Sequence, residues 1–168
     1  MNKLAGAMKP IPILSEEQQL RIVEAIVKAE DCTSGEIRVH VEPKCKADPI
    51  ARAVKVFERL EMHDTAARNG VLIYLAYETR VCAIIGDVAI NEVIPEGFWD
   101  GILAKMQSAF AAGSFTEGII EAVDAVGDAL SEFFPYQSDD VNEQPDEISF
   151  FDEDEEDDDD EEDEDEED

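Results

Sequence analysis

An uninterrupted apolar run, Val71–Ala76, constrains the fold of this chain more than any other feature of the sequence. It has the length of a strand and no alternation of apolar and polar residues, which is typical of a central strand covered on both faces. Asn69 and Gly70 precede it as a turn, and after Tyr77–Arg80 the chain returns as a second apolar strand, Val81–Ile85. The pattern predicts a β-hairpin inside a sheet that has helices on both faces.

Helical patterns and one further strand surround the hairpin. We expect helices over residues 15–30, 48–61, 95–113 and 114–134, and a half-buried strand over Glu36–Val41. Ser15 and Gln18 form a capping box at the start of the first helix. A right-handed crossover through the second helix makes strands 36–41 and 71–76 parallel. The predicted fold class is α/β, a three-layer α/β/α sandwich with a small mixed sheet.

Acidic residues dominate the end of the chain. The 168 residues include 13 Lys and Arg against 43 Asp and Glu, for a formal charge of −30, and about half of the acids follow Pro135. Every residue from 152 to 168 is Asp or Glu, so self-repulsion predicts disorder there. We therefore expect a flexible N-terminus (1–12), a folded domain (13–135) and a disordered acidic tail (136–168).

The rest of the composition narrows the functional class. Three cysteines without a CxxC pair indicate free thiols in a reducing compartment. The chain has no apolar run of signal-peptide or membrane-span length. A mildly acidic body argues against nucleic acid as the main partner. The sequence thus predicts a soluble, cytoplasmic monomer.

Oxygen-bearing side chains converge on one edge of the predicted sheet. A turn centred between residues 78 and 79 places Asn69 opposite Asp87, and the parallel first strand brings Ser34 to the same edge. Glu92 follows in the next loop. Hard oxygen donors of this kind favour divalent cations, Ca²⁺ first. The alternative is structural, with Asp87 capping a turn and Glu92 in solvent.

Familiar catalytic motifs are absent from the sequence. It contains no Gly-rich phosphate loop, no GxSxG and no HExxH. His40 is expected on the solvated side of its strand, and His63 after a helix end, where both are structural. The sequence therefore identifies no catalytic residues.

Several short motifs occur in an order that resembles the TPM domain family, the thylakoid lumen phosphatase-like proteins, in its compact stand-alone branch. They are Ser34-Gly35-Glu36-Ile37, Arg68-Asn69-Gly70-Val71-Leu72-Ile73, Ile85-Gly86-Asp87, the run Ile90–Trp99, Gly113-Ser114-Phe115 and Gly118-Ile119. The resemblance covers about residues 13–135 and implies an α/β/α sandwich. Some members are described as acid phosphatases and some as calcium-binding. Longer members often carry Gly-Tyr-Gly where this chain has Gly86-Asp87.

Three functions follow from these features. The first is a non-catalytic, calcium-binding interaction domain of the TPM type. The second is a metal-dependent acid phosphatase for small phosphomonoesters, which has one edge cation, Arg68, to stabilise a transferring phosphoryl group. The third makes the acidic tail a binding segment for basic proteins. We favour the first, because the catalytic set is thin.

Overall fold

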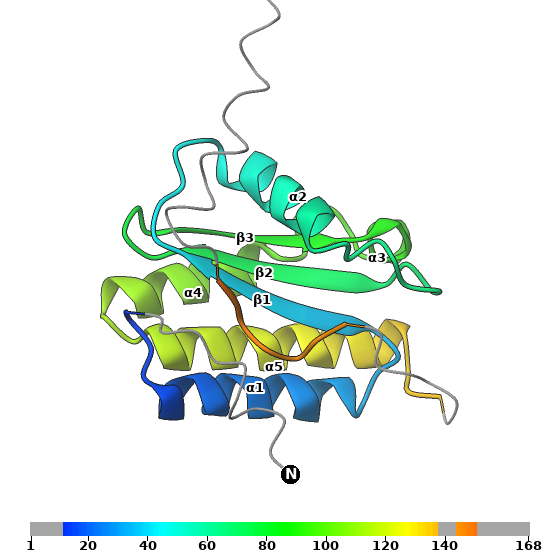
Figure 1. The fold of residues 1–168 in the computed structure, drawn as a ribbon. Coiled ribbons are helices and arrows are strands. Elements are labelled where there is room, and N and C mark those ends of the chain that lie inside the picture. Colours follow the sequence, from blue (N-terminus) through cyan, green and yellow to red (C-terminus); the bar gives the residue numbers. More distant parts are fainter. Residues whose placement is uncertain (1–11, 138–143, 151–168) are drawn as a thin grey trace, which may run out of the picture.

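The computed structural model describes residues 12–137 and 144–150 of the chain. Its helices and strands are shown in Figure 1. The elements are α1 (Glu16–Glu30), β1 (Glu36–Glu42), α2 (Pro49–Arg59), β2 (Gly70–Ala76), β3 (Val81–Gly86), α3 (Val88–Val93), α4 (Asp100–Ala111), α5 (Phe115–Phe133) and β4 (Ser149–Phe150). None of the described helices is long and apolar enough to cross a membrane.

The four strands form one mixed sheet in the order β3-β2-β1-β4. β1 runs parallel to β2 and β3 antiparallel to it, as the crossover and hairpin patterns predicted. Val71 pairs with Gly86, so Asp87 lies beside Gly70 instead of opposite Asn69. The register derived from the sequence was therefore wrong by one residue on one strand.

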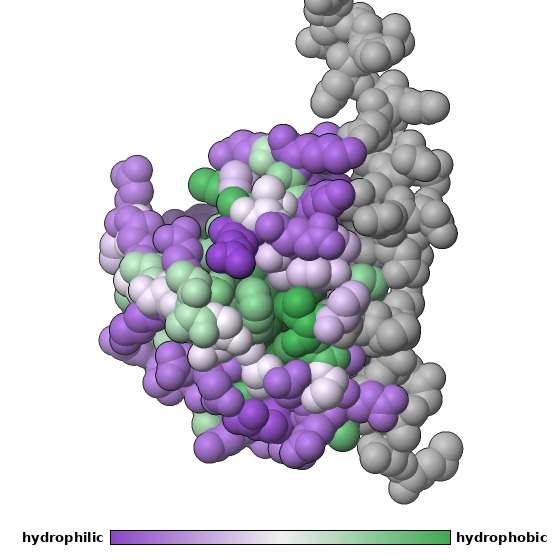
Figure 2. Space-filling view, turned by 90° about the vertical axis from the view of Figure 1, so that its left-hand side faces the viewer, coloured by the Kyte–Doolittle hydropathy of each residue, from purple (hydrophilic) through white to green (hydrophobic). Residues whose placement is uncertain are grey.

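Helices cover both faces of the sheet, so the predicted three-layer α/β/α sandwich is confirmed. Figure 1 shows α2 on one face and α1, α4 and α5 on the other. Alternate residues of β2 enter the two cores: Ile73 packs under α1 and α5, whereas Leu72 and Tyr74 pack under α2. In the side view of Figure 2, hydrophilic residues cover the outer layers and hydrophobic residues gather between them.

The starts of two helices follow from local chemistry. Ser15 Oγ accepts from the Gln18 amide at 3.1 Å, and Gln18 Oε1 accepts from the Ser15 amide at 2.8 Å, which completes the predicted capping box. The third predicted helix begins at Asp100 and not at Pro95. Gly97 has a φ of 78°, which breaks the helical path before that point.

The ordered domain extends beyond residue 135, where the sequence placed the start of a disordered tail. Ser149 and Phe150 form β4, which pairs in parallel with His40 and Val41 of β1. Phe150 is 7% exposed and belongs to the core under α1 and α5. The acidic run from 152 onward and the predicted flexible residues 1–11 lie outside the described residues.

Candidate functional site

Three of the four predicted calcium ligands lie at one edge of the sheet. Asn69 Nδ2 is 3.4 Å from Ser34 Oγ, and the Asn69 carbonyl accepts from the Glu36 amide. The Asp87 amide donates to the Gly70 carbonyl at 2.9 Å. The parallel pairing of β1 and β2 and the antiparallel return of β3 produce this meeting.

The Asp87 carboxylate is already hydrogen-bonded within the chain. Arg68 donates from Nε to Oδ2 at 2.8 Å and from Nη2 to Oδ1 at 2.9 Å, which is a bidentate ion pair. The Val88 amide donates to Oδ1 at 2.7 Å, so Asp87 also caps α3. The Asp87 side chain is 4% exposed, whereas that of Arg68 is 45% exposed. The cation of this pair is thus free to move into solvent, and the carboxylate is fixed.

Glu92 does not join these residues closely. It is an exposed residue of α3, five positions after the cap at Asp87. Five residues rotate a side chain by roughly 500° around a helix, which directs it away from the cap. Asn91 reaches back instead, donating from Nδ2 to the Gly86 carbonyl at 3.1 Å. Within the described residues, no group of three or more His, Cys, Asp or Glu side chains is placed to hold a metal ion.

A buried polar network lies between the sheet and α2. His40 Nε2 is 2.8 Å from Glu42 Oε1, and His40 Nδ1 is 2.9 Å from Ser149 Oγ. Arg52 of α2 donates to both Glu42 oxygens, at 2.9 and 3.0 Å. The Tyr74 hydroxyl donates to Glu42 Oε2 at 2.7 Å, and the Tyr74 ring stacks on that of His40. Glu42 therefore receives four hydrogen bonds and joins α2, β2 and β4 through β1.

Burial and hydrogen bonding set the charges of this network. Burial alone would raise the pKa of Glu42, but hydrogen bonds from His40, Arg52 and Tyr74 outweigh it and lower that pKa to about 2. Burial lowers the pKa of His40, so the imidazole is neutral. Neutral His40 donates from Nε2 to Glu42 and accepts at Nδ1 from the Ser149 hydroxyl. Burial also raises the pKa of Tyr74, and its hydroxyl stays protonated.

The sequence analysis was wrong about His40, which it placed in solvent. The side chain is fully buried, because α2 covers this face of β1 and β4 covers its edge. A signal was present: Glu36, Arg38, His40 and Glu42 put both signs of charge on one side of a strand. Such a set is typical of a buried, mutually satisfied network as well as of a solvated face.

The order Ser149–His40–Glu42 imitates a nucleophile, base and orienting acid. The His40 and Glu42 side chains, however, expose no surface to solvent. A substrate carbonyl must come within about 3 Å of the nucleophile and of oxyanion donors, which this packing prevents. The network accordingly has a structural role, which is to connect β4 and α2 to β1.

Known proteins resemble this chain over most of its length. Residues 10–129 match the family model of the TPM domain. The BA42 protein of the psychrophilic bacterium Bizionia argentinensis is 41% identical, with a TM-score of 0.78, over 85% of this chain and 99% of that one. No protein with curated annotation matches the sequence.

Two more distant solved structures share the fold. The N-terminal domain of a P. gingivalis protein has 20% identity and a TM-score of 0.63, over 75% of this chain and 83% of its own. The N-terminal domain of a Corynebacterium glutamicum protein has 16% identity and a TM-score of 0.57, over 76% and 80%. At these identities the likeness concerns the fold alone.

Proposed function

Because this chain belongs to the TPM domain family, we propose that it is a non-catalytic binding domain and that Ca²⁺ binds at the edge formed by Ser34, Asn69 and Asp87. The supporting observation is that the Asn69 and Ser34 side chains are in contact and that the Asp87 amide binds the carbonyl of Gly70, the residue next to Asn69. A hydroxyl, an amide oxygen and a carboxylate are all oxygen donors that calcium accepts.

The Arg68–Asp87 pair gives the proposal its mechanism. Both Asp87 oxygens accept from Arg68, so a cation must displace the guanidinium to reach the carboxylate. The half-exposed Arg68 side chain has solvent to move into. Glu92 adds negative charge on the same short helix without contacting the donors. Because Arg68 competes with the cation and the site has a single fixed carboxylate, we expect weak binding, with a dissociation constant for Ca²⁺ on the order of 10⁻⁵–10⁻³ M.

The buried network supports binding over catalysis. The residues with the most catalytic appearance, Ser149, His40 and Glu42, are buried and bind one another. They hold β4 beside β1 at the C-terminal end of β1. The proposed calcium edge lies at the opposite end of that strand. Catalysis is not needed to explain either arrangement.

A calcium titration of the full chain, followed by amide NMR shifts, tests this function. Saturable shifts are expected at Thr33–Gly35, Asn69, Gly70 and Asp87. Amides after residue 151 report separately on diffuse binding by the acidic run. Shifts confined to that run would refute the proposal.

Two variants sharpen the test. Asp87→Asn removes the carboxylate and should abolish the shifts, whereas Arg68→Gln removes the competing cation and should tighten binding by about tenfold. Asp48→Asn is the matched control, because Asp48 likewise caps a helix but lies at the other end of β1. If Arg68→Gln binds calcium no better than the parent chain, Asp87 is not the ligand.

A further inference from the structure

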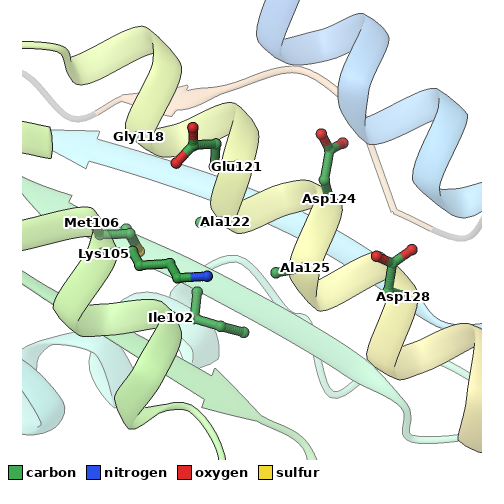
Figure 3. Close-up of a pocket in the computed structure, with 9 residues that line it drawn as sticks. All are labelled: Ile102, Lys105, Met106, Gly118, Glu121, Ala122, Asp124, Ala125 and Asp128. Atoms are coloured by element: carbon green, nitrogen blue, oxygen red, sulfur yellow. The ribbon is translucent and has the colours of Figure 1, made fainter.

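A groove of about 410 Å³ lies between α4 and α5 (Figure 3). The two helices touch closely at one end, where a Cβ on Gly118 would come within 2.8 Å of Ala109 Cβ. α4 has 12 residues and α5 has 19, so the antiparallel pair leaves the C-terminal turns of α5 without a partner from α4. The groove itself lies between Ile102–Met106 of α4 and Gly118–Asp128 of α5, before those last turns.

The floor of the groove is apolar and its wall is acidic. Half-buried Ile102 and Ala125 supply its accessible apolar surface, above Met106 and Ala122, which are almost fully buried. Figure 3 shows Ile102 and Lys105 reaching from α4 toward α5, along which stand the carboxylates of Glu121, Asp124 and Asp128. These three carboxylates are exposed, and within the described residues none of them has an ion-pair partner. Glu117, one turn earlier on α5, is by contrast paired with Arg21.

We propose that this groove binds a basic amphipathic helix of a partner protein. Its apolar floor takes the partner's apolar face, and its carboxylate wall takes Lys or Arg side chains beside that face. Glu121, Asp124 and Asp128 are spaced three and four residues apart, which matches cations at helical spacing on an antiparallel partner. The lining of α5 from Gly118 to Asp128 is about 15 Å long, enough for roughly ten residues of partner helix.

Charge decides which partner fits. Lys105 is the one cation among the described lining residues, against three carboxylates, so the wall is net negative. An acidic or neutral helix would bury carboxylates without compensation, whereas a basic helix neutralises them. The groove lies on the α4–α5 side of the sheet, so its occupant does not depend on the calcium edge.

The experiment uses the full chain and a synthetic amphipathic peptide of about 14 residues, made of Leu and Lys, as the probe. We expect saturable amide shifts over 102–106 and 118–128. A scrambled peptide of the same composition has no apolar face and should shift only amides after residue 151. Equal groove shifts with both peptides, or shifts only after residue 151 with the amphipathic one, would overturn the proposal.

A charge-neutralised variant and a matched control complete the design. Combining Glu121→Gln, Asp124→Asn and Asp128→Asn should weaken peptide binding at the groove by about tenfold, as three exposed ion pairs are lost. The control neutralises three exposed acids outside the groove, with Glu24→Gln, Glu58→Gln and Glu132→Gln. Because all six residues are exposed, both variants should fold. If both triple variants bind the peptide equally weakly, the overall charge attracts the peptide and the groove does not bind it.

Discussion

At the scale of single residues, Glu42 links more elements than any other polar side chain described above. Its carboxylate binds His40, Arg52 and Tyr74 and has no solvent exposure. A charge buried in this way is tolerated because each oxygen has several donors. Removing the negative charge of Glu42 leaves the positive charge of Arg52 uncompensated and weakens the hydrogen bonds from the other donors.

Glu42→Gln should therefore destabilise the domain by about 3 kcal/mol or more, the usual cost of breaking a buried ion pair from one side. Chemical unfolding followed by circular dichroism measures this. Glu58→Gln, an exposed acid on α2, is the control and should change the unfolding free energy by less than about 0.5 kcal/mol. Similar values for the two variants would contradict the role of Glu42.

The pKa of Glu42 also predicts how the stability of the domain depends on pH. Its pKa is lowered to about 2 from an ordinary value of 4.5, so its contribution is present above pH 4.5 and is lost as the pH falls toward 2. The parent chain should lose stability more steeply than Glu42→Gln over this window. Parallel curves of unfolding free energy against pH would argue against a lowered pKa.

Glu30 behaves in the opposite way. Burial, followed by a hydrogen bond with Asp146, raises its pKa to about 10, although the Ile37 amide donates to Glu30 Oε1 at 2.9 Å and lowers it. Two carboxyl groups in contact share a proton more readily than they both ionise. The last residue of α1 thus joins the segment before β4 through a protonated carboxyl.

Glu30→Gln should stabilise the chain increasingly from pH 4.5 to about 10. Below pH 4.5 both the folded and the unfolded parent keep Glu30 protonated; above it the unfolded parent gains stability by ionising, and the variant does not. Thermal melts at pH 4, 7 and 9 measure the difference, with Glu24→Gln, an exposed acid of the same helix, as the control. A variant that is less stable at pH 9 than the parent would contradict the raised pKa.

At the scale of elements, β4 has an importance beyond its two residues. It extends the sheet beyond β1, supplies the Ser149 hydroxyl to His40, and buries Phe150 in the larger core. Gln144 adds a contact from its side-chain amide to the Glu61 carbonyl at 3.3 Å. The segment 144–150 is thus part of the fold.

A chain ending at residue 137 should therefore melt well below the full chain, because it loses β4 and the Phe150 side chain, whose loss alone costs about 3 kcal/mol. A chain ending at residue 151 is the control and should melt no lower than the full chain, since it loses only acidic residues. Thermal melts by circular dichroism compare the three. Equal melting of the two shortened chains would show that β4 contributes little.

At the scale of the whole molecule, the formal charge of −30 opposes folding through self-repulsion. Screening shortens the range of that repulsion to about 10 Å at 0.1 M salt. Raising NaCl from 0.01 to 0.5 M should raise the melting temperature of the full chain, and should do so less for the chain ending at residue 151. Equal salt dependence would indicate that the acidic run does not act on the domain.

The sequence by itself determined the layers of this protein and most of its helices and strands. Val71–Ala76 has no polar position, so it had to be covered on both faces, and the capping box at Ser15 fixed the start of α1. These features depend on neighbours along the chain and on the chemistry of a single segment. The order of the elements then left few topologies for a right-handed crossover.

Tertiary structure alone decided which polar residues are buried and which segments join the domain. His40 is buried because α2 and β4 cover it. Ser149 is buried although it follows a polar, acidic segment, because its hydroxyl bonds to His40 Nδ1, whose other ring nitrogen bonds to Glu42. Likewise, Asp87 was expected to lie opposite Asn69, but its carboxylate forms an ion pair with Arg68. Each outcome depends on residues far apart in the sequence, and periodicity reports only which side of an element a residue occupies, not what lies on that side.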